Sequence, residues 1–362
     1  MAAVDPTAVF RAELAAERKS LRAVQSDLRR RDAEIAKLTA QLQAERDAEA
    51  ERQLAAAHAL KPVSIPIETH AGGAPGYPVV LWSDWHWGET VDIREMNGIN
   101  AFNPEIAAAR VKRLVNGTIT LLREYAGTNP TYPGMWVCLG GDMISGNIHD
   151  ELRDTNWTPG ADQVSQVTEV LAGALERMHA EFGTLHVPCV VGNHGRVSVR
   201  PRAKSQVKEN FEWIVYKSLE RHFASNPAVT FYIPEGPDYH FEIYGHRFML
   251  THGDRLGVKG GDGIIGAVGP ITRGAFKISR QQAQIGRDFD TLLMGHWHTY
   301  TPRGDANNTI VNGSLKGFDE YAMNMLRVPF SEPAQALWLV SPKHGIAAQW
   351  RVDCGNLTGV DP

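Results

Sequence analysis

The chain has 362 residues, and 37 Lys and Arg against 41 Asp and Glu give it a formal net charge of −4. With 43% hydrophobic and 22% charged residues, its composition excludes wholesale disorder, collagen-like repeats and a disulfide-framed miniprotein. The charge balance excludes a polybasic protein that coats nucleic acid by bulk attraction. No apolar run approaches the ~18 residues that span a bilayer, and the N-terminal residues show no secretory signal pattern. We therefore expect a cytoplasmic protein with no membrane partner.

Residues 1–60 are rich in Ala, Glu, Arg and Leu and carry an apolar residue at every seventh position. This column consists of Leu14, Leu21, Leu28, Ile35 and Leu42. The other column of the heptad seam is half polar, with Glu17 and Arg31 among its members. The spacing predicts a long helix that forms a coiled coil, and hence a homo-oligomer through this helix. The alternative is a single amphipathic helix packed on the body of the protein.

Residues 61–78 carry four prolines and three glycines, which predicts a linker before a domain over residues 79–362. In that domain, apolar strand-like runs at 79–84, 135–142 and 186–194 alternate with predicted helices at 103–125, 162–182 and 207–223. Asn103 before Pro104 is a typical helix start.

Later apolar runs look more antiparallel and predict a second sheet packed on the first. They lie at 241–245, 246–254, 291–298, 309–314 and 336–341. We expect an α/β fold in which a two-sheet β-sandwich is flanked by helices and preceded by the long N-terminal helix.

Five of the predicted strand ends carry side chains that bind hard or borderline cations. They are Asp84-x-His86, Gly141-Asp142, Gly192-Asn193-His194, His252 and Gly295-His296-x-His298. Imidazole, carboxylate and amide oxygen without thiolate suit Zn, Mn, Fe or Ni in a catalytic site. A single polar residue after a strand is usually a cap or a turn residue, but five in series are hard to explain in that way.

The order of these five blocks, between about Val79 and Leu315, resembles the calcineurin-like metallophosphoesterase family. The first block, DWHWGE, and the segment GNHGRVSVRPRAK look similar to phage- and prophage-encoded, exonuclease-like members, whose compartment would be the host cytoplasm. The resemblance implies the two-sheet metallophosphoesterase fold. It also implies two divalent metal ions about 3.5–4 Å apart, with Mn favoured over Zn, Fe or Ni.

The resemblance also implies a role for each matching residue. Asp84, His86 and His298 are the ligands expected for the first metal. Asn193, His252 and His296 are those expected for the second, and Asp142 is expected to bridge the two. A hydroxide between the metals would attack phosphorus, and His194 would donate a hydrogen bond to the phosphate or a proton to the leaving alkoxide. The family usually has Asp or Glu after this histidine to orient it, whereas this chain has Gly195, so Asp150, Glu151 or another acid would have to substitute.

The loops suggest how a substrate could bind. Arg196, Arg200 and Arg202 closely follow His194, and a cationic loop beside a dimetal centre favours a phosphodiester backbone; the alternative is a solvated loop. His149 follows Asp142 and could contact the substrate. The glycine-rich residues 257–270 are interpreted as an active-site flap.

The sequence therefore predicts a dimetal phosphodiesterase that acts on nucleic acid, as a nuclease does. One alternative is a phosphomonoesterase that acts on proteins or small molecules. A second is a coiled-coil scaffold whose metal site is vestigial.

Overall fold

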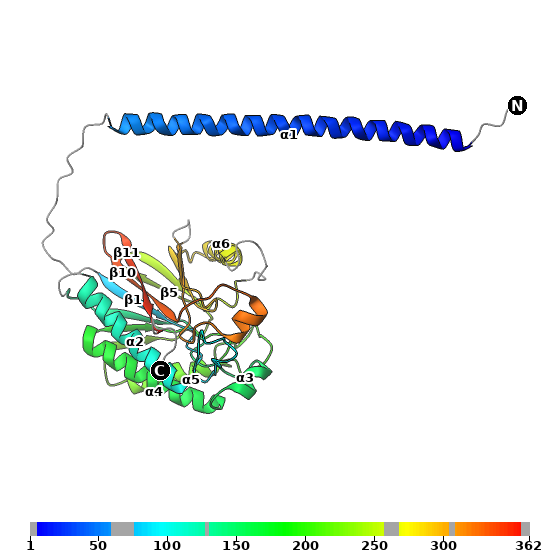
Figure 1. Ribbon diagram of the computed structural model, residues 1–362. Helices are drawn as coiled ribbons and strands as arrows, with labels where there is room; N and C mark the ends of the chain where they lie inside the picture. The colour runs from blue at the N-terminus through cyan, green and yellow to red at the C-terminus, as the bar shows by residue number, and fades with distance from the viewer. Residues whose placement is uncertain (1–5, 59–75, 127–129, 257–267, 304–307, 356–362) are drawn as a thin grey trace. The chain divides into compact units, whose positions relative to one another are not determined.

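The computed structural model describes residues 6–58, 76–126, 130–256, 268–303 and 308–355 (Figure 1). The chain forms two compact units, Met1–Ala71 and Gly72–Pro362. In the first unit, α1 (Pro6–His58) is one helix of 53 residues, which confirms the predicted long helix. Most of its apolar heptad side chains are more than half exposed, from 54% at Leu42 to 60% at Leu21. The predicted linker lies outside the described residues as far as residue 75.

The second unit contains two β-sheets. The first has six strands in the order β11-β10-β1-β2-β3-β4. Its strands are β1 (Tyr77–Trp82), β2 (Met135–Leu139), β3 (Leu185–Pro188), β4 (Val229–Tyr232), β10 (Ala334–Ser341) and β11 (Gly345–Asp353). Strands β1 to β4 are parallel, and β10 joins them antiparallel to β1, with Val79 opposite Trp338.

The second sheet has five strands in the order β5-β6-β7-β9-β8. They are β5 (Tyr239–Ile243), β6 (His246–Leu250), β7 (Thr291–Met294), β8 (Thr301–Arg303) and β9 (Asn308–Val311). The expectation of an antiparallel second sheet is only partly right, because β6, β7 and β9 pair in parallel. Residues 336–341 were expected with the later strands, but they belong to β10 of the first sheet. Seven of the eight β10 residues are buried, so this strand needs a position that is covered on both faces.

Helices connect and flank the strands. They are α2 (Pro104–Thr120) with its π-helical continuation η1 (Leu121–Tyr125), α3 (Asp150–Thr155), α4 (Gly160–Phe182), α5 (Phe211–His222), α6 (Val268–Gln284) and η2 (Tyr321–Leu326). The Asn103 side chain accepts the N–H of Ile106 at 2.8 Å and caps α2 as predicted. Helix α5 begins later than predicted because Asn210 caps it, accepting the N–H of Glu212 at 2.9 Å.

The two sheets and their helices make four layers, and alternate residues of each central strand face different layers. Val80 and Trp82 of β1 pack under the layer of α2, α4 and α5, whereas Val79 and Leu81 pack between the sheets. On the far side of the second sheet, residues such as Met249 pack against α6. This arrangement confirms the predicted two-sheet sandwich flanked by helices. Within the described residues, no helix combines the length and the apolar character that crossing a membrane requires.

Candidate metal centre

Loops from both sheets meet at the edge where their parallel strands end. In the first sheet, the Asp84 N–H donates to the Gly141 carbonyl at 2.9 Å, which joins the loops after β1 and β2. In the second sheet, the Gly295 N–H donates to the His252 carbonyl at 2.9 Å. The Asp84 carboxylate accepts the N–H of His296 at 2.8 Å and so links the two sheets. All five predicted blocks therefore converge at one edge.

Most of the expected ligands have a left-handed backbone. The φ angles are 56° at Asp84, 48° at His86, 52° at Asp142, 66° at His296 and 53° at His298. A residue other than glycine in this region costs on the order of 1–3 kcal/mol, and such strain clusters at functional sites. The turns at Asp84 and His86 end the run of β1 and bring both side chains of the Asp-x-His block to one point.

Two glycines of these loops allow a candidate carboxylate ligand to approach the backbone closely. A Cβ atom on Gly192 would lie 2.1 Å from Asp142 Oδ1, and a Cβ atom on Gly295 would lie 2.1 Å from Asp84 Oδ2. Neither contact is physically possible. The glycines are required because the carboxylates approach the neighbouring loop so closely.

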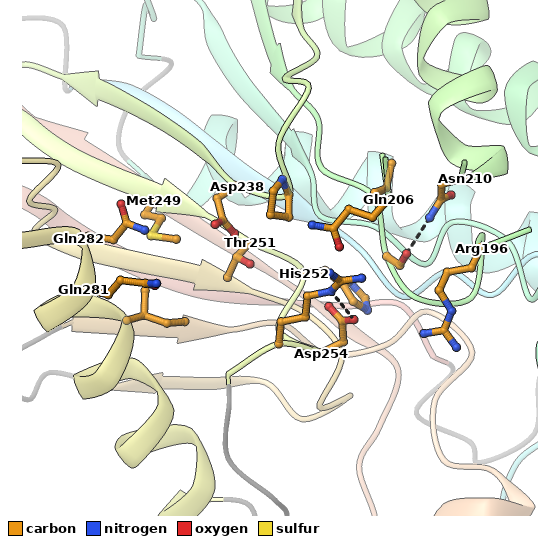
Figure 2. A pocket seen from close by; sticks show the side chains of 15 residues that line it. Arg196, Gln206, Asn210, Asp238, Met249, Thr251, His252, Asp254, Gln281 and Gln282 are labelled. Atoms are coloured by element: carbon orange, nitrogen blue, oxygen red, sulfur yellow. Dashed lines mark hydrogen bonds and ion pairs between the residues drawn. The ribbon is translucent and has the colours of Figure 1, made fainter. Parts of the chain in front are cut away.

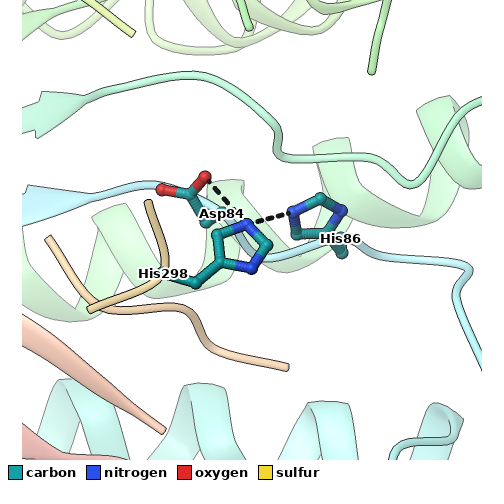
Figure 3. Close-up of side chains that lie close together, drawn as sticks. All are labelled: Asp84, His86 and His298. Carbon is teal, nitrogen blue, oxygen red and sulfur yellow. Dashed lines mark hydrogen bonds and ion pairs between the residues drawn. The ribbon is translucent and has the colours of Figure 1, made fainter. Parts of the chain in front are cut away.

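The first group of candidate ligands consists of Asp84, His86 and His298 (Figure 3). The Nε2 atoms of the two imidazoles face each other at 3.0 Å, and His298 Nε2 lies 3.4 Å from Asp84 Oδ1. Burial, and next the charge of Lys316, hold the pKa of His86 well below its usual range, so its ring is neutral. A neutral imidazole and a carboxylate that converge in this way suit a divalent cation.

The second group consists of Asp142, His252 and His296. His252 Nδ1 lies 2.9 Å from the Gly140 carbonyl, which can only accept, so Nδ1 carries a proton. Its Nε2 then faces two acceptors, Asp142 Oδ2 at 2.9 Å and Asn193 Oδ1 at 3.2 Å. Burial opposes a charge on His252, but the Asp142 carboxylate outweighs burial and raises the His252 pKa well above its usual range. A positive charge is therefore needed at Nε2, and a bound cation would supply it in place of the proton.

Asp142 lies between the two groups. It is within reach of His86 and His194 as well as of its own group, and its Oδ1 accepts the N–H of His194 at 2.7 Å. Burial disfavours its charge, yet His252 holds the pKa of Asp142 well below the usual range. Burial, and next the charge of His252, lower the pKa of His296 to about 4, so that ring is neutral. The seven predicted ligands thus lie together, with Asp142 where a bridging residue is expected.

Glu212 supports both ligand loops and was missed by the sequence analysis. Its buried carboxylate accepts the N–H of Met143 at 2.5 Å and that of Gly192 at 2.6 Å, next to Asp142 and Asn193. Burial, and next the charge of Asp142, raise the pKa of Glu212 to about 7. Its only sequence signal is an acidic residue in the first turn of α5.

Glu212 and its neighbour Asn210 also explain the unexpected Gly195. A Cβ atom on residue 195 would lie 2.2 Å from Asn210 Oδ1 and 2.8 Å from Glu212 Cγ. The side chains at the N-terminal cap and first turn of α5 therefore occupy the space that an acidic residue after His194 would need.

His194 is oriented by a backbone carbonyl. Its Nδ1 donates to the Ser145 carbonyl at 2.7 Å, and its ring lies 4.5 Å from that of His86. Asp150 was expected as a substitute partner, but its side chain is 95% exposed and pairs with Arg153 at 3.6 Å. Glu151 is exposed as well. The Ser145 carbonyl thus takes the orienting role that was expected of an acid.

The four candidate substrate residues differ in their positions. Arg196 is half-buried and lines a cavity of about 80 Å³ beside His252 (Figure 2). The His149 ring is exposed and lies 5.7 Å from that of His194. Arg200 is exposed, and the exposed Arg202 side chain forms an ion pair with Glu209 at 2.6 Å. Of the predicted flap, residues 257–267 lie outside the described part of the chain, and residues 268–270 begin α6.

No protein-family model and no curated protein matches the sequence. Among solved structures, the chain is similar to vacuolar protein sorting 29 from Cryptosporidium parvum, with 12% identity and a TM-score of 0.32 over 74% of this chain and 86% of that one. It is similar to a putative 5'-nucleotidase from Staphylococcus aureus, with 9% identity and a TM-score of 0.35 over 78% of this chain and 55% of that one. It is also similar to a phosphopantetheinyl hydrolase from Mycobacterium tuberculosis, with 12% identity and a TM-score of 0.31 over 70% of this chain and 94% of that one. At such low scores, function has to be inferred from the side chains of the site.

Proposed function

We propose that the chain is a dimetal-dependent phosphoesterase that hydrolyses phosphodiester bonds, with nucleic acid as the favoured substrate. The observation that carries the proposal is the environment of His252. Its buried Nε2 faces the oxygens of Asp142 and Asn193 at 2.9 and 3.2 Å, a position that requires a positive charge, either a proton or a cation. A second convergence of nitrogen and carboxylate atoms lies beside it, on the other side of Asp142.

The donor set fits two divalent cations. Asp84, His86 and His298 would hold the first, and Asn193, His252 and His296 the second, with Asp142 between them. When bound, such cations lower the pKa of water and neutralise charge on phosphoryl oxygens. Imidazole, carboxylate and amide ligands suit Mn, Zn, Fe or Ni, and we propose Mn because the resemblance to the metallophosphoesterase family favours it.

The chain's own residues supply proton transfer and positioning. The Ser145 carbonyl fixes the proton of His194 on Nδ1, which leaves Nε2 free to hold a second proton and to donate it to a leaving oxygen. Arg196 lines the cavity beside His252 and would orient a phosphate oxygen. The His149 ring lies 5.7 Å from that of His194 and would contact the leaving group.

Hydrolysis of bis(p-nitrophenyl) phosphate with Mn²⁺ tests the proposal. The native chain should cleave the diester, and Asp142→Ala should abolish cleavage because the residue between the cations is lost. Glu176→Ala removes a surface carboxylate that pairs with His222 and serves as the control. Equal rates for native and Asp142→Ala would refute the proposal.

The choice between substrate classes requires a second comparison. A phosphodiesterase should prefer the diester and DNA or RNA, whereas a phosphomonoesterase should prefer p-nitrophenyl phosphate. A chain that takes up no transition metal even after reconstitution would be a scaffold with a vestigial site.

We also propose that α1 pairs with a second copy of the chain. Five apolar residues at heptad spacing form one column along the helix, and four of them are 54–60% exposed. Such a column is self-complementary between identical helices. Leu28→Lys should lower the assembly size measured by light scattering, and the exposed Lys37→Glu should not. An unchanged size for Leu28→Lys would contradict the pairing.

A further inference from the structure

A buried cluster of charges lies directly behind the first group of candidate ligands. It consists of Glu89, Lys316 and Asp319, each at most 5% exposed. The Lys316 ammonium donates to Glu89 Oε1 at 2.6 Å and to Asp319 Oδ2 at 2.5 Å. Burial opposes the charge of Lys316, but Asp319 and then Glu89 outweigh it and raise the Lys316 pKa above its usual range. Two carboxylates and one ammonium leave the cluster one negative charge in excess.

The free oxygen of this cluster points at a candidate ligand. Glu89 Oε2 lies 3.3 Å from His86 Nδ1, and neither atom has a hydrogen-bond partner of standard geometry in the part of the chain that the structure describes. The other nitrogen of the same ring, Nε2, faces His298. His86 therefore has a carboxylate on one side and the candidate cation position on the other.

The backbone holds this cluster in place. The Glu89 N–H donates to the His86 carbonyl at 3.0 Å, so the two residues share one turn. The Leu315 N–H donates to the Asp84 carbonyl at 3.0 Å, which fixes the residue before Lys316 to the same loop. The buried Arg110 guanidinium donates to the carbonyls of Leu315 and Lys316 at 3.0 and 2.6 Å. The carboxylate is thus set rigidly behind the ligand.

We propose that Glu89, held by Lys316, is a positioning residue that orients His86 and strengthens cation binding in the first group only. This inference rests on the proposed function. A carboxylate behind a metal-bound imidazole fixes its tautomer and raises its basicity as a ligand. In the second group, the atom behind His252 is instead the neutral Gly140 carbonyl oxygen, at 2.9 Å from Nδ1. The two groups should therefore respond differently to loss of the Glu89 charge.

Titration of the metal-free full-length chain with Mn²⁺ in a calorimeter tests the proposal. Glu89→Gln keeps the side-chain volume and removes the charge. We expect its affinity at the first group to fall about 10- to 100-fold, the range typical of such partners, while the second group changes less than about twofold. Glu320→Gln is the matched control, because Glu320 is half-buried nearby and accepts the Asp92 N–H at 2.7 Å without touching a ligand. It should bind as the native chain does.

Several outcomes would overturn the inference. If Glu89→Gln binds Mn²⁺ as the native chain does, or if both groups weaken equally, Glu89 has no specific role toward His86, whereas the proposed function survives. If the native chain binds no Mn²⁺, both proposals fail.

A second measurement does not depend on the variant's folding. In ¹⁵N spectra of the metal-free native chain, the His86 ring should be protonated at Nδ1, since that atom faces Glu89 Oε2. A ring protonated at Nε2 instead would refute the inference.

Discussion

Cation binding to the second group should release a proton, because the structure places one on His252. The Asp142 carboxylate, 2.9 Å from Nε2, raises the His252 pKa well above 6.5 although burial opposes it. At pH 7 the metal-free protein therefore carries an imidazolium there, and a cation can bind only after Nε2 loses its proton. His86 and His296 have lowered pKa values and release none.

The expected size of the effect follows from these states. His252 releases about one proton per ion bound near pH 7, so the apparent affinity of the second group should rise about tenfold per pH unit, or about 1.4 kcal/mol. The rise should continue until the pH reaches the pKa of His252. Glu212, with a pKa of about 7, should release up to about half a proton more, because a cation offsets the charge of Asp142 that raises this pKa.

Calorimetry in two buffers with different protonation enthalpies measures this release. The difference between the binding heats, divided by the difference between the protonation enthalpies, should give about 1 to 1.5 protons released for each cation that the second group binds. The variant His252→Asn keeps a polar ligand but has no group to deprotonate at this position. The number of protons released on binding should therefore fall by about one. Heats that are independent of the buffer, together with an affinity that stays constant from pH 6 to 8, would refute this account of the site.

Three further predictions concern the loops and the metal-free protein. Gly295→Ala should abolish Mn²⁺ binding by the first group, because the added Cβ would lie 2.1 Å from Asp84 Oδ2. Gly173→Ala is the control, because its Cβ would meet open space and should leave binding unchanged. Equal Mn²⁺ titrations of the two variants would contradict the steric argument. Asn210→Ala should lower the free energy of unfolding by about 1–2 kcal/mol in urea, because α5 loses its cap; an unchanged midpoint would count against this. A raised folded-state pKa at His252 stabilises the protein below pH 6.5, so the metal-free chain should become less stable as the pH rises above 6.5. A free energy of unfolding that rises above pH 6.5 would contradict this prediction.

That the seven candidate ligands lie together could be predicted from sequence because their signal is local. Each ligand directly follows an apolar strand, and parallel strands carry such ends to one edge of a sheet. The cap at Asn103 is also local, since Asn before Pro suffices to start a helix. From the sequence, we could infer only that the strand must end near Asp84 and His86. The left-handed backbone conformation of these two residues could not be predicted.

The rest depends on contacts between distant segments. Lys316 contacts Glu89 across 227 residues, and no spacing pattern links them. Glu212 reaches the loop at Met143 across 69 residues, so its support of the site was invisible in sequence. The last long strand, β10, was expected with the later strands, because an apolar run shows that a strand is buried but not which neighbour it pairs with.

Anomalous diffraction from crystals of the full-length chain soaked in Mn²⁺ would locate the bound cations. We predict two peaks per chain about 3.5–4 Å apart, one among Asp84, His86 and His298 and one beside His252, with Asp142 between them. A map without a peak at this edge of the sheets, or with Mn²⁺ bound only elsewhere, would contradict the claim that these side chains form a dimetal centre.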